Sequence, residues 1–338
     1  MFKEFIHYQP LSGFQKKEIN KFKKDLSYKY ENIDCPLCNN KNHKILFDNE
    51  RHGIKQKTVM CLNCGLVFLN PRMDYESTKQ FYNSDIYRLI YSKDSDKDKS
   101  NFYTSVCKEI EDYKFTPPKL PNFTKYYANL YLDFIYQERQ DFKNICDIGC
   151  GKGLKLLDFK NLDKKVFGVD PSKILNKCHK KYHINSKVGF IDDIEGSYDL
   201  VLITHVLEHL HNIDEAIKKI EKITKKYLFI EVPGHVKKLQ SIQNAHNFYF
   251  SFNTLNHFVQ NNKFRLIKMD YARDSEFIFA LFEKTEKKNN FTFSYDVEKK
   301  FIDKIMIKYQ FKYVVLKILK FFYIEKIVKK IFNMARKN

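Results

Sequence analysis

The sequence predicts an α/β protein built on a doubly wound, seven-stranded and mostly parallel sheet, with a small cysteine-bearing module before it and a helical tail after it. Three observations predict this architecture. Between residues 144 and 284, strand-like apolar runs alternate with helix-like segments, which is typical of parallel strands joined by crossover helices. Two C-x-x-C pairs precede that region. After residue 296, apolar residues recur every three or four positions, which is helical spacing.

The same patterns divide the chain into segments. The first is a Lys-rich, partly helical lead-in, and the second carries the cysteine pairs among short β-like runs. The third is predicted to form linking helices that can act as a lid. The predicted segments are the lead-in at 1–32, the cysteine module at 33–75, the linker helices at 76–124, the α/β domain at 125–285 and a basic amphipathic helical tail at 286–338.

The strand candidates of the α/β domain are short apolar runs bounded by polar or turn residues. The last two lie close together in the sequence, which predicts that they form a final antiparallel hairpin. The seven candidates are 144–148, 166–169, 187–190, 198–203, 227–232, 264–270 and 276–282.

The net charge of the chain bears on whether it binds an anionic partner. The 338 residues carry a formal net charge of +19, but only seven of the 60 basic residues are Arg. Sites that bind phosphates usually present Arg forks as well as Lys, so the basicity is weak evidence for an anionic partner. Neither a signal-peptide pattern nor an apolar run of membrane-spanning length is present. We therefore expect a cytoplasmic protein whose eight cysteines are thiols or metal ligands.

A glycine-rich loop is the strongest single motif. Residues 146–153 read CDIGCGKG, between an apolar strand and an apolar helical run. Glycines at positions 149, 151 and 153 let the backbone turn sharply and approach a ligand, and the following helix offers free N–H groups to an anion. The spacing G-x-G-x-G differs from the dinucleotide fingerprint G-x-G-x-x-G. A dinucleotide-binding domain and a cofactor-free α/β domain remain the alternatives.

Two further segments give the loop a context. The next strand ends in Asp170, which is placed to accept hydrogen bonds from both ribose hydroxyls of an adenosine. Residues 198–210 (YDLVLITHVLEHL) supply the fourth strand and the start of its helix. These three segments, in this order, resemble the motifs of class I methyltransferases. The resemblance covers roughly residues 125–285.

The resemblance implies a site for S-adenosylmethionine (SAM). The three glycines would line the methionine end, and Asp147 would help to hold the ammonium group. Asp170 would bind the ribose and Asp192 would face the adenine, while the turn at 204–205 would pass near the sulfonium. The implied cofactor-binding residues are Asp147, Gly149, Gly151, Gly153, Asp170, Asp192, Thr204 and His205.

The two cysteine pairs predict a metal site. Each C-x-x-C pair can hold one side of a tetrahedral ion, and four thiolates suit zinc. Because protein would fill all four positions, the zinc would be structural. A redox C-x-x-C is the alternative. The predicted ligands are Cys35, Cys38, Cys61 and Cys64.

Residues 61–72 (CLNCGLVFLNPR), followed by Tyr82 and Tyr87, resemble the N-terminal zinc module of certain bacterial sugar methyltransferases. Those enzymes act on nucleotide-activated sugars or on surface glycans, and their module closes over the substrate. The resemblance makes both tyrosines lid candidates, and plain packing is the alternative.

A loop after the fifth strand supplies the candidate base. Residues 244–251 (NAHNFYFS) are similar to the E-H…F-S stretch of the same family, and His246 falls on its catalytic histidine. We expect this loop to face the cofactor cleft. Ala245 and Gln243 replace the acidic residue and the tyrosine of the family, which favours O-methylation over C-methylation. A structural role for His246 is the alternative. Weaker candidates are Glu208, His209, His211 and Glu231.

These features predict a SAM-dependent methyltransferase that O-methylates a nucleotide- or lipid-linked sugar in polysaccharide or glycoprotein glycan biosynthesis. A nucleic-acid methyltransferase is one alternative. The turn at 204–207 (THVL) lacks the acidic or Asn-Pro-Pro-aromatic residues that hold an exocyclic amine, and arginines are sparse. A non-catalytic adaptor is another, although the intact glycine loop argues against lost cofactor binding.

The tail has two interpretations. Residues 299–337 hold 12 basic and two acidic residues. With interleaved apolar positions, they could form a helix that lies on the inner membrane face. The alternative is a helical hairpin packed on the main domain with a solvated Lys face.

Overall fold

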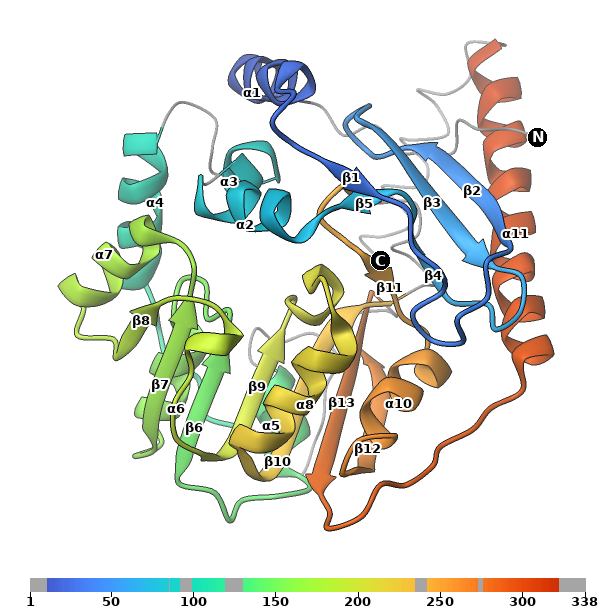
Figure 1. Ribbon diagram of the computed structural model, residues 1–338. Helices are drawn as coiled ribbons and strands as arrows, with labels where there is room; N and C mark the ends of the chain where they lie inside the picture. The colour runs from blue at the N-terminus through green and yellow to red at the C-terminus, as the bar shows by residue number, and fades with distance from the viewer. Residues whose placement is uncertain are drawn as a thin grey trace.

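The computed structural model describes residues 11–84, 86–91, 99–118, 130–234, 242–272 and 276–321. Its main body is one seven-stranded sheet with helices on both faces (Figure 1). The strand order is β12-β13-β10-β9-β6-β7-β8, and only the two pairs that involve β13 are antiparallel. The predicted fold class and the final antiparallel hairpin are therefore confirmed. The strands are β6 (Asn144–Ile148), β7 (Lys165–Asp170), β8 (Ser186–Val188), β9 (Tyr198–Thr204), β10 (Thr224–Pro233), β12 (Phe264–Ala272) and β13 (Phe277–Lys284).

One strand is shorter than the sequence analysis predicted. The run 187–190 was expected to be extended, but β8 ends at Val188. Residues 191–193 form a 3-10 turn, η1 (Ile191–Asp193), in which Asp193 accepts a hydrogen bond from the backbone N–H of Phe190. This local side-chain bond competes with the sheet ladder and draws the chain away from it.

Alternation along the strands produces two cores. Val201 and Ile203 of β9 pack with helices α8 (Ile213–Ile223) and α10 (Phe252–Gln260). Leu200 and Leu202 point to the other face and pack with α5 (Leu130–Tyr136). This is the period of two that a strand buried on both faces requires. The remaining helices of this domain are α6 (Leu154–Lys160) and α7 (Lys173–Lys181).

A second sheet carries the cysteine pairs. Its order is β11-β4-β3-β2, and β11 comes from the chain after β10 rather than from the N-terminal segment. Phe248 and Tyr249 of β11 pair with Phe68 and Val67 of β4. The loop that contains His246 is thereby attached to the cysteine module. The strands are β2 (His43–Asn49), β3 (Lys55–Cys61), β4 (Val67–Leu69) and β11 (Phe248–Tyr249), and β1 (Tyr30–Glu31) pairs separately with β5 (Arg72–Met73).

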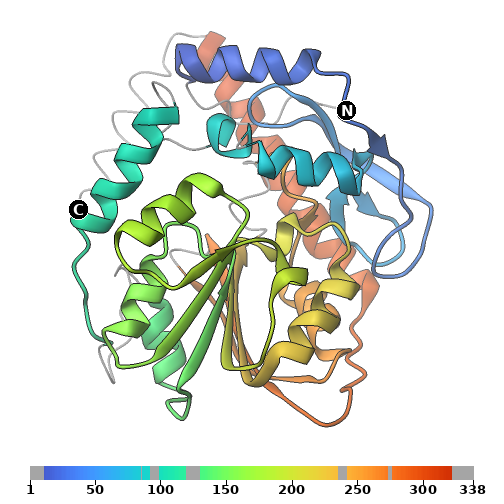
Figure 2. The same cartoon turned by 60° about the vertical axis from the view of Figure 1, so that its left-hand side comes forward.

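Helices from the N-terminal third of the chain, coloured blue to teal, lie over one end and along one flank of the large sheet (Figure 2). The lead-in helix α1 begins after Ser12, whose side chain accepts a hydrogen bond from the N–H of Gln15 while the Gln15 side chain accepts one from Ser12 N–H. This is a capping box. The predicted linker segment 76–124 contains helices. Two of them, α2 and α3, lie over the end of the large sheet at which its parallel strands terminate. The four helices are α1 (Gly13–Lys24), α2 (Tyr75–Asn83), α3 (Ile86–Tyr91) and α4 (Lys99–Glu111).

The predicted tail, 286–338, is helical over 295–321, while residues 286–294 are described as irregular chain. Helix α11 (Tyr295–Phe321) lies against the cysteine module (Figure 1). Ile302 and Met306 are buried with the hydrophobic residues of β2–β4, and Lys44 forms a 2.8 Å ion pair with Asp303. Farther along, Phe311 is 72% exposed. No helix in the described ranges is long and apolar enough to cross a bilayer. Residues 322–338 lie outside the described residues, and contact of the tail with a membrane surface stays a prediction.

Candidate cofactor and acceptor site

A pocket of about 710 Å³ lies at the carboxyl ends of the parallel strands, which is where doubly wound sheets bind ligands. Its floor is the glycine loop and the ends of β7 and β9, and α2 and α3 supply its opposite wall. The volume is within the range of small-molecule sites, roughly 300 to 1,000 Å³. Seven of the eight predicted cofactor residues line the pocket: Asp147, Gly149, Gly151, Asp170, Asp192, Thr204 and His205.

The glycine loop has the backbone that its sequence predicts. Gly149 has φ +69°, and a Cβ there would lie 2.3 Å from Cγ2 of Val206. Gly151 has φ +54°, so its left-handed backbone is what favours glycine. Gly153 is the predicted residue that does not line the pocket. It caps α6 with φ +79° and packs near Ile184, so the structure gives it a place in helix packing.

Asp170 bonds both to the glycine loop and to helix α3. Its Oδ2 accepts a 3.0 Å hydrogen bond from the N–H of Gly151, and its Oδ1 accepts one from the N–H of Ser172. The guanidinium of Arg88, from α3, lies 2.8 Å from the same Oδ1. The carboxylate therefore connects the glycine loop to helix α3. Arg88 lies about 80 positions before Asp170, and no motif in the sequence signals the pair.

The carboxylate of Asp147 shows whether the pocket suits the amino-acid end of SAM. This residue is 1% exposed, and its Oδ1 is buried without a hydrogen bond. An unpaired buried carboxylate oxygen is costly. Because Asp147 lines the pocket, the ammonium group of a bound methionine moiety would satisfy it. Together with the glycine loop, the chain's own residues fit the amino-acid end of SAM.

SAM affinity is expected to fall as the pH drops below about 7. Burial raises the pKa of Asp147 to about 7, with Lys155 opposing the shift and Asp170 and Glu231 adding to it. Only the ionised carboxylate attracts the ammonium group, so protonation at lower pH weakens binding by up to about tenfold per pH unit. Calorimetry at pH 6 and pH 8 measures this effect. The variant Asp147→Asn should bind weakly with a flat profile, and a flat wild-type profile would contradict the assignment.

Aromatic and imidazole side chains form the other end of the pocket. Tyr82 lies with its hydroxyl 2.8 Å from Nδ1 of His209, and the ring of Tyr87 packs edge-on against the same imidazole, with 5.3 Å between ring centroids. His205 has a positive φ of 56°. Burial opposes its charged form, but the carboxylates of Glu208 and Glu231 outweigh that effect and raise the pKa of His205 to about 9. Both lid candidates thus contact the acceptor side of the pocket.

His246 lies one layer behind the pocket wall. It is 7% exposed and is not among the residues that line the pocket. Its ring packs against His209 with centroids 4.6 Å apart, and its Nε2 is 3.9 Å from Oε1 of Glu208. None of residues 244–251 lines the pocket, so the expectation that this loop faces the cleft is not met. His209, a weaker candidate from the sequence, lines the pocket instead and packs on His246.

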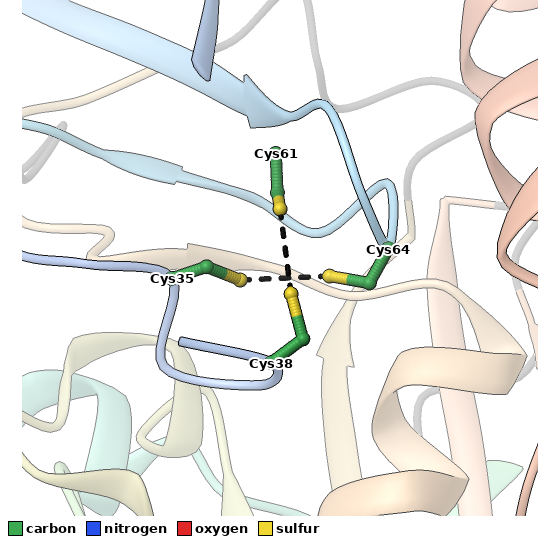
Figure 3. Close-up of side chains that lie close together, drawn as sticks. All are labelled: Cys35, Cys38, Cys61 and Cys64. Atoms are coloured by element: carbon green, nitrogen blue, oxygen red, sulfur yellow. Dashed lines mark hydrogen bonds between the residues drawn. The ribbon is translucent and has the colours of Figure 1, made fainter. Parts of the chain in front are cut away.

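The four predicted metal ligands converge on one point (Figure 3). The sulfurs of Cys35 and Cys64 are 3.5 Å apart, as are those of Cys38 and Cys61. A tetrahedral zinc with Zn–S bonds of about 2.3 Å has sulfur–sulfur edges of about 3.8 Å. The donor set and its geometry are therefore compatible with zinc. The other four cysteines are free thiols outside this cluster.

Comparison with known proteins identifies the α/β domain. Residues 122–269 match the family described as "Methyltransferase domain". This match covers less than half of the chain and lies on the α/β domain. The prediction of a SAM-dependent methyltransferase is confirmed at this level.

Two curated relatives are ubiquinone biosynthesis O-methyltransferases. The chain is 34% identical over 88 residues to that of Rhodopseudomonas palustris (strain BisB18), which is 23% of this chain and 34% of the relative. It is 34% identical over 109 residues to that of Pelagibacter ubique (strain HTCC1062), which is 29% of this chain and 45% of the relative. The chain thus spans less than half the length of the curated relatives it matches.

Two solved structures are more distant. A SAM-dependent methyltransferase from Archaeoglobus fulgidus is 18% identical, covering 46% of this chain and 91% of its own, with a TM-score of 0.41. Magnesium protoporphyrin IX methyltransferase from Synechocystis PCC 6803, solved with bound S-adenosylhomocysteine, is 15% identical. It covers 63% of this chain and 100% of its own, with a TM-score of 0.40. TM-scores this low carry no conclusion about function.

Proposed function

We propose that the protein transfers the methyl group of SAM to a hydroxyl oxygen of a nucleotide- or lipid-linked sugar. The observation that carries the proposal is a single pocket with two unlike ends. One end has the glycine loop, Asp170 and the unsatisfied carboxylate of Asp147, which suit SAM. The other end has imidazole and phenol groups, which suit a polar acceptor.

SAM supplies a methyl group on a sulfonium that is already activated, so the new C–O bond forms as the C–S bond breaks. The protein's task is then to position the acceptor and to help its hydroxyl lose a proton. Imidazoles suit that task near neutral pH. His205 and His209 line the pocket, and we propose that the predicted base His246 acts through His209, on which it packs.

The O-methyl assignment has support from the relatives, whose printed names specify O-methyltransferases. In the loop sequence, Ala245 and Gln243 stand where the resembled family has its acidic residue and its tyrosine, which favours the same atom. The proposal of a sugar acceptor rests on the resemblance of the cysteine module and the His246 loop to sugar methyltransferases. The structure joins these two features physically, because β11 beside His246 pairs with β4 of the module.

The test is methyl transfer from labelled SAM to a panel of acceptors. The panel contains nucleotide-sugars, polyprenyl-linked sugars and, as the competing class, catechol-type phenols. We expect labelled product from a linked sugar with wild-type protein and none with Asp170→Asn. Labelled phenols without any labelled sugar would reject the sugar acceptor but would still support O-methyl transfer. SAM binding without transfer to any hydroxyl acceptor in the panel would count against both.

We also propose that the four cysteines hold a structural zinc ion. The support is their convergence, their donor chemistry and the lack of an open coordination position.

A further inference from the structure

Glu208 is a buried carboxylate that the described protein groups leave unsatisfied. It lies on the 3-10 turn η2 (Leu207–His209), just beyond the end of β9. The residue is 1% exposed, and neither carboxylate oxygen has a hydrogen-bond partner among the described residues. Carboxylates at such positions are normally paired closely or coordinate a metal, because an isolated buried charge is very costly.

Three imidazole nitrogens face one oxygen of this carboxylate. The distances to Oε1 of Glu208 are 3.6 Å from Nδ1 of His205, 3.8 Å from Nε2 of His209 and 3.9 Å from Nε2 of His246. These distances exceed those of hydrogen bonds, which are about 2.7 to 3.2 Å. Ligand atoms about 2.1 Å from a shared tetrahedral ion would be about 3.4 Å apart. The spacing therefore suits atoms arranged around a common ion better than atoms bonded to each other.

The outer nitrogens of two histidines already have acceptors. Nδ1 of His209 lies 2.7 Å from the carbonyl oxygen of Ala245, so this nitrogen carries the hydrogen and donates. Nε2 of His205 lies 3.1 Å from Oε1 of Glu231 and donates to it. In this tautomer the inner nitrogen of His209, Nε2, presents a lone pair toward Glu208. Metal-bound histidines are held in the same way, with the other ring N–H donating to a carbonyl or a carboxylate.

A lone pair that faces a carboxylate is repulsive unless a cation lies between them. A proton on His205 could supply one positive charge, but the 3.6 Å distance is long for the hydrogen bond that such a proton would form. The amide of Gln243 also contacts Nε2 of His246. His209 and Glu208 therefore form the firmest part of the site.

We propose that Glu208, His209 and His246, whose ligand atoms lie within 4.8 Å of one another, bind a divalent transition-metal ion at the acceptor end of the pocket. A set of imidazoles with one carboxylate suits zinc and neighbouring first-row ions. His205 and His209 line the pocket, so the ion has an entry path and an open side. This site is distinct from the cysteine cluster.

The role of the ion rests on the proposed function. An acceptor hydroxyl bound at the open side would have its pKa lowered, as metal-bound water does. With the ion bound, His209 and His246 would be ligands rather than the base, so the hydroxyl proton would leave to solvent when the hydroxyl binds. The resulting oxygen would form the C–O bond as the C–S bond breaks. The same ion would fix the acceptor oxygen in the pocket.

Metal content tests the proposal independently of activity. Full-length protein with its cysteine cluster loaded is incubated with Co²⁺, and bound metal is measured by elemental analysis and absorption. We expect a second ion whose spectrum lacks the thiolate charge-transfer bands of a cysteine site. Glu208→Gln should weaken its binding by about 100-fold or more. Glu215→Gln removes an equivalent charge elsewhere on the pocket lining and should leave the binding unchanged.

Thermal unfolding separates the metal site from a plain ion pair. If an ion fills the site, a chelator that spares the cysteine cluster lowers the Tm of wild-type protein but not that of Glu208→Gln. Without the ion, Glu208→Gln should be the more stable protein, because it removes an unsatisfied buried charge. A pairing with protonated His205 alone predicts that Glu208→Gln is less stable under both conditions.

Binding of only the cysteine-site metal at saturating Co²⁺ would overturn the proposal, as would an unchanged second site in Glu208→Gln. SAM binding measured on the same samples separates the two proposals. Normal SAM binding and methyl transfer without a second ion would reject the metal site alone. A second ion without methyl transfer to any acceptor would reject the proposed function alone.

Discussion

Replacing Asp170 by asparagine is expected to weaken SAM binding by at least about 100-fold. The carboxylate is positioned by the N–H groups of Gly151 and Ser172 at the bottom of the pocket. Hydrogen bonds from a ribose to a charged acceptor contribute about 1.5 to 3 kcal/mol each, so the loss of two corresponds to at least about 3 kcal/mol. The asparagine amide also lacks the negative charge that forms the ion pair with Arg88. Isothermal titration calorimetry with SAM measures the change directly.

Two controls isolate the contribution of the carboxylate to cofactor binding. Asp163→Asn makes the same chemical change at an exposed residue with a φ of 56°, a conformation that asparagine tolerates, and should bind SAM normally. Arg88→Gln breaks the contact with the lid but keeps Asp170, and should cost less affinity than Asp170→Asn. Equal losses in the two pocket variants would mean that Asp170 acts through the lid rather than on the ribose.

The sequence predicted the large sheet well because its signals are local. Each strand is an apolar run, and the loop glycines mark a turn that only positive φ allows, as Gly149 and Gly151 show. The acidic end of the second strand, Asp170, follows from the same short-range pattern. The extent of β8 was wrong because a side-chain hydrogen bond from Phe190 N–H to Asp193, which periodicity does not show, ends the strand early.

The acceptor end was harder to predict because it is assembled from distant segments. Tyr82 and His209 are 127 positions apart, and Ala245, whose carbonyl fixes the imidazole of His209, lies 36 positions further on. The sequence selected His246 from a resemblance, yet the pairing of β11 with β4 places it behind His209. Tertiary pairing of this kind decides which of several neighbouring histidines lines a pocket.

Loss of the metal from the cysteine cluster is expected to lower the Tm by about 10 °C or more. Cys35, Cys61 and Cys64 are fully buried in the same core as Phe248 and Phe250, next to the His246 loop. Structural zinc contributes folding free energy outright, and a loss of several kcal/mol shifts the Tm of a domain this size by about 2 to 4 °C per kcal/mol. Differential scanning calorimetry of Cys61→Ser, alongside its zinc content, measures the effect.

Cys107→Ala is the matched control, because it removes a buried thiol outside the cluster. It should keep the zinc and lose only about 1 kcal/mol. Cys61→Ser should also disturb the pocket. The reason is that β4 pairs with β11 and thereby positions the segment of Ala245 and His246. We therefore expect Cys61→Ser to lose acceptor turnover more than SAM affinity. Wild-type stability that is unchanged by complete zinc removal would show that the module is held by its hydrophobic core alone.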